Sequence, residues 1–247
     1  MPETGQRRRR ESDQFLTAKK YGTFIDCCGG KMTSGLFLTS LSIILGGIIT
    51  IGIALFVEWY RGARLNVKCP SCEVIPNPPS LIRSYRVIVT NKLPLLRFLP
   101  RNPAFQCEGE ISFHHLDGQN MFGRSLKAKW SESPEPFLYA TEKNTGKEFQ
   151  IVDPSRMTSR IDIYPGQEKQ LDVLAKYGDE SEAYSWSNET YSKGWRNPDW
   201  QLKSGRYLIN VTINSSGKKV NRIFRFINDV AADDCRLEDA QEQDKIY

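Results

Sequence analysis

Histidine is scarce in this chain of 247 residues, and the sequence signatures of several enzyme classes are missing. The only histidines are His114 and His115, which are adjacent. The sequence has no Gly-x-Ser-x-Gly elbow for a serine nucleophile, no His-Glu-x-x-His pair for a metal ion and no glycine-rich phosphate loop. These absences remove the sequence support for hydrolytic, metal-dependent and nucleotide-dependent catalysis. We therefore expect a protein that is not an enzyme and that uses no cofactor.

Charged residues are missing from one long stretch. Residues 35–57 read GLFLTSLSIILGGIITIGIALFV, and at about 1.5 Å per residue a helix of this length crosses a hydrocarbon core of roughly 30 Å. The alternative is a cleaved signal peptide, whose apolar core is about 7–15 residues long and precedes a small-residue cleavage site. This segment continues instead into Glu58, Trp59 and Tyr60. The sequence predicts a transmembrane helix over residues 35–58.

Lysine and arginine flank this segment unequally. Those before it are Arg7, Arg8, Arg9, Arg10, Lys19, Lys20 and Lys31, and those soon after it are Arg61, Arg64 and Lys68. Because cytoplasmic flanks carry the excess of basic residues, we expect a single-pass protein of the cell membrane with a cytoplasmic N-terminus and an extracytoplasmic C-terminal domain. The net charge of +5 comes largely from the N-terminal tail. We assign it to contact with the lipid membrane and expect no nucleic acid as a partner.

Composition divides the rest of the chain into segments. Residues 1–34 are polar and lack a hydrophobic period, which predicts a disordered basic cytoplasmic tail. Residues 59–80 include CPSCEVIPNPPS, whose four prolines predict an extended Pro-rich stalk. The folded domain is expected over residues 81–228. Residues 229–247 are acidic and weakly apolar, so we expect a loosely attached C-terminal tail.

Short alternating or β-branched runs fill the expected folded domain. They read YRVIVTN, CEGEISFHH, SLKAKW, EFQIV, SRIDIY, QLDVLAKY, RYLINVTIN and VNRIFRFIN, with Gly, Pro, Asn, Asp and Ser between them. No amphipathic helical segment of comparable quality is present. About eight strands in about 150 residues predict a mainly β fold: a single N-terminal transmembrane α-helix followed by an antiparallel two-sheet β-sandwich.

The end of the expected domain resembles a known class of modules. The final hairpin, SGRYLINVTINSSGKKVNRIFRF, is preceded by IDIYPGQEKQLDVL. This rhythm of strands and turns resembles the fibronectin type III-like and cell-adhesion-related β-sandwich modules of bacterial and archaeal surface proteins. The resemblance covers residues 81–228 and implies an immunoglobulin- or fibronectin-like sandwich in an uncharacterised membrane-anchored surface protein. It transfers no site residues, and the aromatic insert between Lys176 and Gln201 departs from it.

The spacing of Cys69 and Cys72 suggests two kinds of thiol chemistry. Two thiolates three residues apart can bind one zinc ion, but the chain has no second Cys-x-x-Cys. The remaining candidate ligands are scattered: Cys107, Cys235, His114 and His115. A redox dithiol resembling that of thioredoxin-like enzymes needs a helix after the motif, and the prolines that follow prevent one. Cys69 and Cys72 are therefore weak candidates for a metal or redox site.

Structural disulfides are the third interpretation of the cysteines. On the extracytoplasmic side Cys69, Cys72, Cys107 and Cys235 form an even set of four in an oxidising compartment. Three pairings are possible. We favour Cys69 with Cys72, which stiffens the stalk, and Cys107 with Cys235, which pins the acidic tail to the sandwich.

Aromatic residues crowd the insert AYSWSNETYSKGWRNPDW. They are Tyr184, Trp186, Tyr191, Trp195 and Trp200. Flat rings with polar neighbours can stack on sugar rings or receive a partner protein, which makes a carbohydrate-binding surface module using Trp186, Trp195 and Trp200 an open hypothesis. The alternative is that the rings hold the insert against the sandwich, because Trp and Tyr are usually well buried.

Two further patterns concern modification and assembly. Asn188, Asn210 and Asn214 each begin an Asn-x-Ser/Thr triplet, the acceptor pattern for glycosylation. Small residues in the apolar segment, namely Ser42, Gly46, Gly47 and Gly52, permit close packing between membrane helices and thus self-association. The sequence as a whole predicts a membrane-anchored β-sandwich protein with a binding or assembly role and a protein or glycan partner. The alternative is a thiol redox or zinc protein using Cys69 and Cys72.

Overall fold

The computed structural model describes residues 32–247, apart from residues 78–79, 97, 144, 179, 195, 230–233, 245 and 247. For residues 32–37, 69–71, 77, 80, 154 and 192 it describes the backbone only. The chain divides into two compact units, residues 1–53 and residues 54–247. The predicted basic tail over residues 1–34 lies almost wholly outside the described part of the chain.

The predicted apolar helix is present as α1, Met32–Arg61. Its residues 38–61 are long and apolar enough to cross a membrane, and its large apolar side chains from Leu38 to Phe56 are exposed. Two hydroxyls bond within the helix: Ser42 Oγ donates to Leu38 O at 2.9 Å, and Thr50 Oγ1 donates to Gly46 O at 2.8 Å. The helix therefore satisfies its own polar groups, as an apolar surrounding requires.

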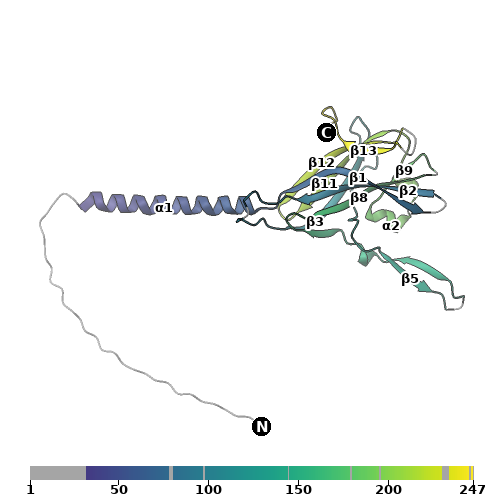
Figure 1. Cartoon of the computed structure of the whole chain (residues 1–247), viewed down its shortest axis with the longest axis horizontal. Coiled ribbons are helices and arrows are strands. Elements are labelled where there is room, and N and C mark those ends of the chain that lie inside the picture. Colours follow the sequence, from purple (N-terminus) through teal and green to yellow (C-terminus); the bar gives the residue numbers. More distant parts are fainter. Residues whose placement is uncertain are drawn as a thin grey trace, which may run out of the picture. The chain divides into compact units, whose positions relative to one another are not determined.

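Two antiparallel sheets form the β domain (Figure 1). The first has the order β1 (Leu65–Asn77), β2 (Ser80–Asn91), β8 (Glu168–Tyr177), β9 (Ala183–Ser185) and β10 (Gln201–Leu202). The second has the order β13 (Arg236–Asp239), β12 (Lys218–Ile227), β11 (Arg206–Ser215), β3 (Ala104–His114) and β4 (Leu126–Lys127), and β7 (Arg160–Ile163) also pairs with β3. Each of the eight predicted strand runs overlaps one of these strands or β6, so the mainly β antiparallel fold is confirmed.

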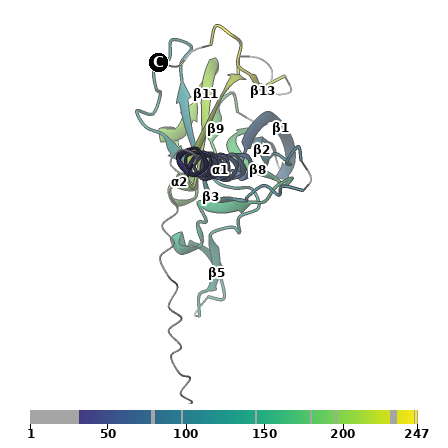
Figure 2. The same ribbon diagram turned by 90° about the vertical axis from the view of Figure 1, so that its left-hand side faces the viewer.

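Shorter elements lie outside these two sheets. They are the hairpin of β5 (Phe137–Thr141) and β6 (Glu148–Val152), the helix α2 (Asn188–Lys193), and the 3₁₀ turns η1 (Pro154–Arg156) and η2 (Pro198–Trp200). Figures 1 and 2 show the β5–β6 hairpin extending away from the sheets. The helix α2 and the turn η2 both belong to the aromatic insert.

One hydrophobic core lies between the sheets. Tyr85 of β2 and Phe226 of β12 are fully buried, and their rings meet edge to face at 5.6 Å between centroids. The final hairpin shows how the sequence encodes the packing, because alternate residues of β11 face the core. Ile209 pairs with Phe224 and Ile213 with Val220, as the alternation predicts.

The predicted stalk is wrong for residues 65–77, which form β1. This strand pairs with β2 from Leu65 opposite Asn91 to Asn77 opposite Ser80, and its register shifts between Lys68 and Ser71. Because β1 is an edge strand, half of its backbone N–H groups have no ladder partner. Proline is therefore tolerated there, especially beside a bulge.

The predicted loose tail is wrong for residues 236–239, which form β13. This strand pairs with β12, with Leu237 opposite Phe226, and Leu237 is buried among otherwise polar neighbours. Beyond the strand, Asp244 forms an ion pair with Arg225. The acidic segment is thus attached to the open edge of β12 by backbone pairing, by the buried Leu237 and by ion pairs of Arg225 with Asp244 and of Arg222 with Asp239.

The buried side chain of Asn91 joins the end of α1 to the sheets. Its Oδ1 accepts from Arg64 N at 3.1 Å, and its Nδ2 donates to Asn102 O at 3.2 Å and to Ile163 O at 3.1 Å. The backbone adds a bond from Asn102 N to Arg61 O at 2.7 Å. The last two turns of α1 therefore belong to the same compact unit as the β domain.

Replacing this amide tests the junction. Asn91→Ala leaves one part-buried donor, one part-buried acceptor and one buried acceptor without their partner, so we expect the free energy of unfolding to fall by about 2–3 kcal/mol. Urea unfolding of the detergent-solubilised full chain, followed by tryptophan fluorescence, measures it. Asn221→Ala, at an exposed position of β12, is the matched control and should change stability by less than about 0.5 kcal/mol. Equal midpoints for the two variants would contradict the assignment.

Candidate functional site

The aromatic insert is folded onto the β domain. Tyr184, Tyr191 and Trp200 are buried and Trp186 is half-buried, whereas Trp195 lies outside the described residues. Ser187 begins the helix α2, where its backbone N donates to Thr190 Oγ1 at 3.0 Å. The described rings therefore pack, and they do not form an open platform for a sugar.

Neighbouring side chains cover the ring of Trp200. Phe122 meets it edge to face at 5.5 Å between centroids. The charged groups of Arg124 and Lys193 lie 5.1 and 5.2 Å from the ring centroid, where the negative face of an aromatic ring attracts cations. A ligand ring would have to displace one of these side chains to stack on this tryptophan.

A cluster of charges is buried beneath the insert. Asp172 of β8 is 2% exposed and accepts from Arg86 Nε at 2.7 Å and from Ser131 Oγ at 2.6 Å, while Lys129 Nζ lies 4.0 Å away. The hydroxyl of Tyr191 donates to Glu135 at 3.2 Å, and burial raises the pKa of Tyr191 well above its usual range. These groups neutralise one another and hold the segment 129–135 and α2 against the sheet, which is a structural role.

The predicted disulfides are wrong. Cys72, Cys107 and Cys235 are thiols in the structure, so none of the three pairings of the four cysteines is present. Cys107 lies beside the Ser215 end of β11. Cys235 directly precedes β13, which pairs with the Ile227 end of β12, and Ile227 lies opposite Arg206 at the other end of β11. The ten residues from Arg206 to Ser215 span about 30 Å, far beyond the roughly 7 Å between Cα atoms that a disulfide allows. The strands that separate the two thiols could not be placed from the sequence.

The local setting of the thiols also differs from that of a metal or redox centre. Cys72 lies in an extended strand opposite Tyr85, and desolvation raises the pKa of its thiol, whereas an attacking thiol needs a lowered pKa. The side chain of Cys69 is not described. Across the described residues, no three His, Cys, Asp or Glu side chains gather as ligands for one ion.

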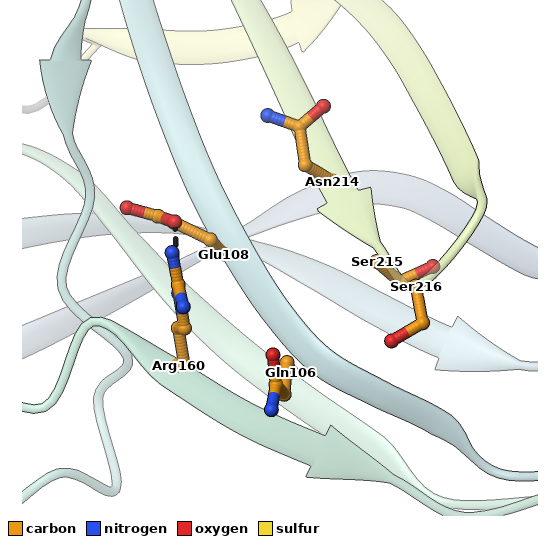
Figure 3. A pocket seen from close by; sticks show the side chains of 6 residues that line it. All are labelled: Gln106, Glu108, Arg160, Asn214, Ser215 and Ser216. Carbon is orange, nitrogen blue, oxygen red and sulfur yellow. Dashed lines mark hydrogen bonds and ion pairs between the residues drawn. The ribbon is translucent and has the colours of Figure 1, made fainter.

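A polar hollow of about 230 Å³ opens beside the β11–β12 turn (Figure 3). Its lining residues are Gln106, Glu108, Arg160, Asn214, Ser215 and Ser216. Glu108 accepts from Lys127 Nζ at 2.8 Å and from Arg160 Nε at 3.1 Å, and these contacts, that with Lys127 first, lower the pKa of its carboxyl group. Figure 3 shows Glu108 and Arg160 pointing toward each other. The hollow thus contains side chains of both charges together with amides and hydroxyls.

Gln106 shapes one wall of this hollow. With a φ of 51° it is the one non-glycine residue of positive φ in the described part of the chain, and its backbone N donates to Asp162 Oδ1 at 2.8 Å. The ladder between β3 and β7 shifts register around it, between Ala104 and Cys107. Such strained residues are frequent at binding sites, and nothing in the sequence marks this one.

A second hollow, of about 200 Å³, shares Ser215 and Ser216 with the first and reaches Gly62 and Ala63 just after α1. Lys218 Nζ donates to Ala63 O at 2.7 Å and forms part of its wall. The two hollows make one surface, the junction surface, built from the start of β3, the β11–β12 turn and the residues that follow α1.

The remaining predicted residues are dispersed. Asn188 is buried and donates to Ala128 O at 3.4 Å, and the Oδ1 of Asn210 is buried too. Asn214 is half-buried, donates to Glu110 at 3.3 Å and lines the polar hollow. Of the two histidines, His114 is buried with its ring nitrogens 2.9 Å from Gly118 O and Ser112 Oγ, whereas His115 is exposed. The structure brings only Asn214 of these residues to the junction surface.

Comparison with known proteins adds no identity: no family model, no curated protein and no solved structure matches this chain.

Thiol labelling tests the revised account of the cysteines. In the folded full chain without reductant, N-ethylmaleimide should modify the exposed Cys72, whereas Cys107 should react only after unfolding, because burial raises its pKa to about 11 and closes access. Mass spectrometry of the digested protein measures this. A requirement for reductant before Cys107 or Cys235 reacts would show a disulfide and contradict the structure.

Proposed function

We propose that this chain is a single-pass membrane-anchored β-sandwich protein that acts through binding or assembly and not through catalysis. The observation that carries the proposal is the junction. A helix of membrane-spanning length, with exposed apolar side chains, ends in the same compact unit as the β domain, and Asn91 connects the two. A helix joined in this way would anchor the domain and its binding surface to the bilayer.

The environments of the titratable groups support binding over catalysis. His114 has both ring nitrogens within hydrogen-bonding distance of oxygen atoms, and the buried Asp172 is matched by Arg86 and Lys129. Side chains that are already hydrogen-bonded or paired with an opposite charge are poorly suited to general acid or base catalysis, which needs a group that can exchange a proton near neutral pH.

The junction surface is the proposed binding surface. Its polar hollow combines the Glu108–Arg160 ion pair with the amides of Gln106 and Asn214, a mixture that suits an extended polar segment of a protein partner. Small residues of α1 allow self-association as a form of assembly, because a Cβ atom added at Gly46, Gly47 or Gly52 would meet nothing within 4 Å.

The unequal distribution of basic residues around α1 supports a cytoplasmic N-terminus. The two antiparallel sheets around one core support a sandwich of the immunoglobulin or fibronectin kind.

Protease protection tests the anchorage and the orientation. In intact cells that produce the chain with an epitope tag at each end, external protease should remove the C-terminal tag and spare the N-terminal tag. Permeabilised cells, in which both tags should be lost, are the control. Survival of the C-terminal tag in intact cells would contradict the proposed orientation.

Photo-crosslinking in the same cells tests the binding surface. A photoreactive amino acid at Ser216, which lines both hollows, should give a discrete protein adduct. The matched control is Thr145, another exposed hydroxyl residue in a hairpin turn, on the β5–β6 hairpin. The absence of an adduct at Ser216, or the same adducts at both positions, would contradict a binding role for the junction surface.

A further inference from the structure

The loop between β2 and β3, residues 92–103, exposes large apolar side chains in one short stretch. Leu93 is 67% exposed, Leu95 is 91% exposed and Phe98 is 77% exposed. Trp59, in the last turn of α1, is 65% exposed. Single exposed leucines are ordinary on protein surfaces, but a cluster of this kind usually marks a surface that another molecule or a membrane covers.

The loop is bonded to the end of α1 at three points. Lys92 N donates to Arg64 O at 3.0 Å, Leu96 N donates to the hydroxyl of Tyr60, and Asn102 N donates to Arg61 O at 2.7 Å. The apolar run of the helix ends at Val57, one turn before these contacts. The exposed leucines and phenylalanine therefore belong to the part of the β domain that adjoins the end of the apolar run.

Internal contacts support the loop from behind. Arg101 is buried, and its guanidinium donates to the carbonyl oxygens of Lys92 and Leu93. At Gly166, a Cβ atom would lie 2.9 Å from a methyl carbon of Leu93, so the neighbouring turn fits closely against this side chain. The hydrogen bonds of Arg101 and the close contact of Gly166 with Leu93 therefore support the conformation of the loop in which Leu95 and Phe98 are exposed.

Basic and aromatic groups accompany the apolar ones. Lys92 and Arg64 are exposed, and the guanidinium of Arg64 lies 4.8 Å from the ring centroid of Trp59. Tryptophan and basic side chains are typical of the level at which a membrane meets water, because the ring partitions among the headgroups and the cation binds anionic phosphate.

We propose that Lys92, Leu93, Leu95 and Phe98 of the loop between β2 and β3 form, together with Arg64, a membrane-docking surface. It inserts Leu93, Leu95 and Phe98 into the boundary between headgroups and acyl chains, with Lys92 and Arg64 at the phosphates, and thereby holds the β domain on the bilayer in one orientation. The occupant is the lipid bilayer because the loop is bonded to the residues at which the apolar helix ends. The inference rests on the proposed membrane anchorage of α1 and adds a second lipid contact to it.

Photo-crosslinking to lipid tests the surface. The full chain carrying p-benzoylphenylalanine at position 98 is reconstituted into vesicles of phosphatidylcholine, with or without phosphatidylglycerol, and illuminated. The matched control carries the same residue in place of Phe149, an exposed phenylalanine of the β5–β6 hairpin. Both native side chains are exposed, so neither replacement disturbs the core. Mass spectrometry should find lipid adducts several-fold more abundant at position 98 than at position 149.

A charge reversal separates the headgroup contact from the apolar one. Lys92→Glu should lower the adduct yield at position 98 in vesicles that contain phosphatidylglycerol, and should change it little in phosphatidylcholine alone. An equal effect in both kinds of vesicle would overturn the assignment of Lys92 to headgroups of net negative charge.

Alkaline extraction distinguishes failure of this inference from failure of the anchorage. If the chain stays in the vesicles and position 98 gives no more lipid adduct than position 149, the docking surface is overturned and the anchorage stands. An adduct from position 98 to a second copy of the chain would also overturn the assignment to lipid. Release of the chain by alkali without lipid adducts would overturn both proposals.

Discussion

The amide side chain of Asn91 is the contact on which the functional geometry of this protein depends. It is fully buried, and it bonds at once to the residues after α1, to the end of the β2–β3 loop and to the end of β7. An unpaired amide or carbonyl group in such a place costs about 1–3 kcal/mol. Separating the three segments would therefore leave these polar groups unpaired, and this cost holds the segments together.

Two surfaces of different character adjoin this junction. The polar hollow beside the β11–β12 turn contains the Glu108–Arg160 ion pair and suits a protein segment. The β2–β3 loop presents Leu95 and Phe98 and suits lipid. The two proposals concern different parts of the same compact unit: the loop contacts lipid, and the hollow receives a protein segment.

Sequence reasoning succeeded where the signal was local. The apolar run of residues 35–57 and the alternation in β11 each depend only on the surroundings of one helix or one strand. Both elements are present as predicted. It failed where a segment pairs with a neighbouring strand although its composition predicts no regular structure. The prolines of residues 65–77 favour a stalk, yet an edge strand accepts them. The acidic tail forms β13 because it pairs with β12, buries Leu237 and forms ion pairs with arginines of β12.

The sequence by itself thus determined the apolar helix, most of the strands and the antiparallel hairpin at the end of the domain, because the period of apolar residues is a property of neighbouring positions. Only the tertiary structure decided that Cys107 and Cys235 lie apart, that the insert's described aromatic rings are largely buried and that Asn91 meets Asn102 and Ile163. It also brought Gln106, Arg160 and Asn214 to one hollow. These outcomes depend on which strands become neighbours, and strand order is set by the burial of the whole core and not by any local run of residues.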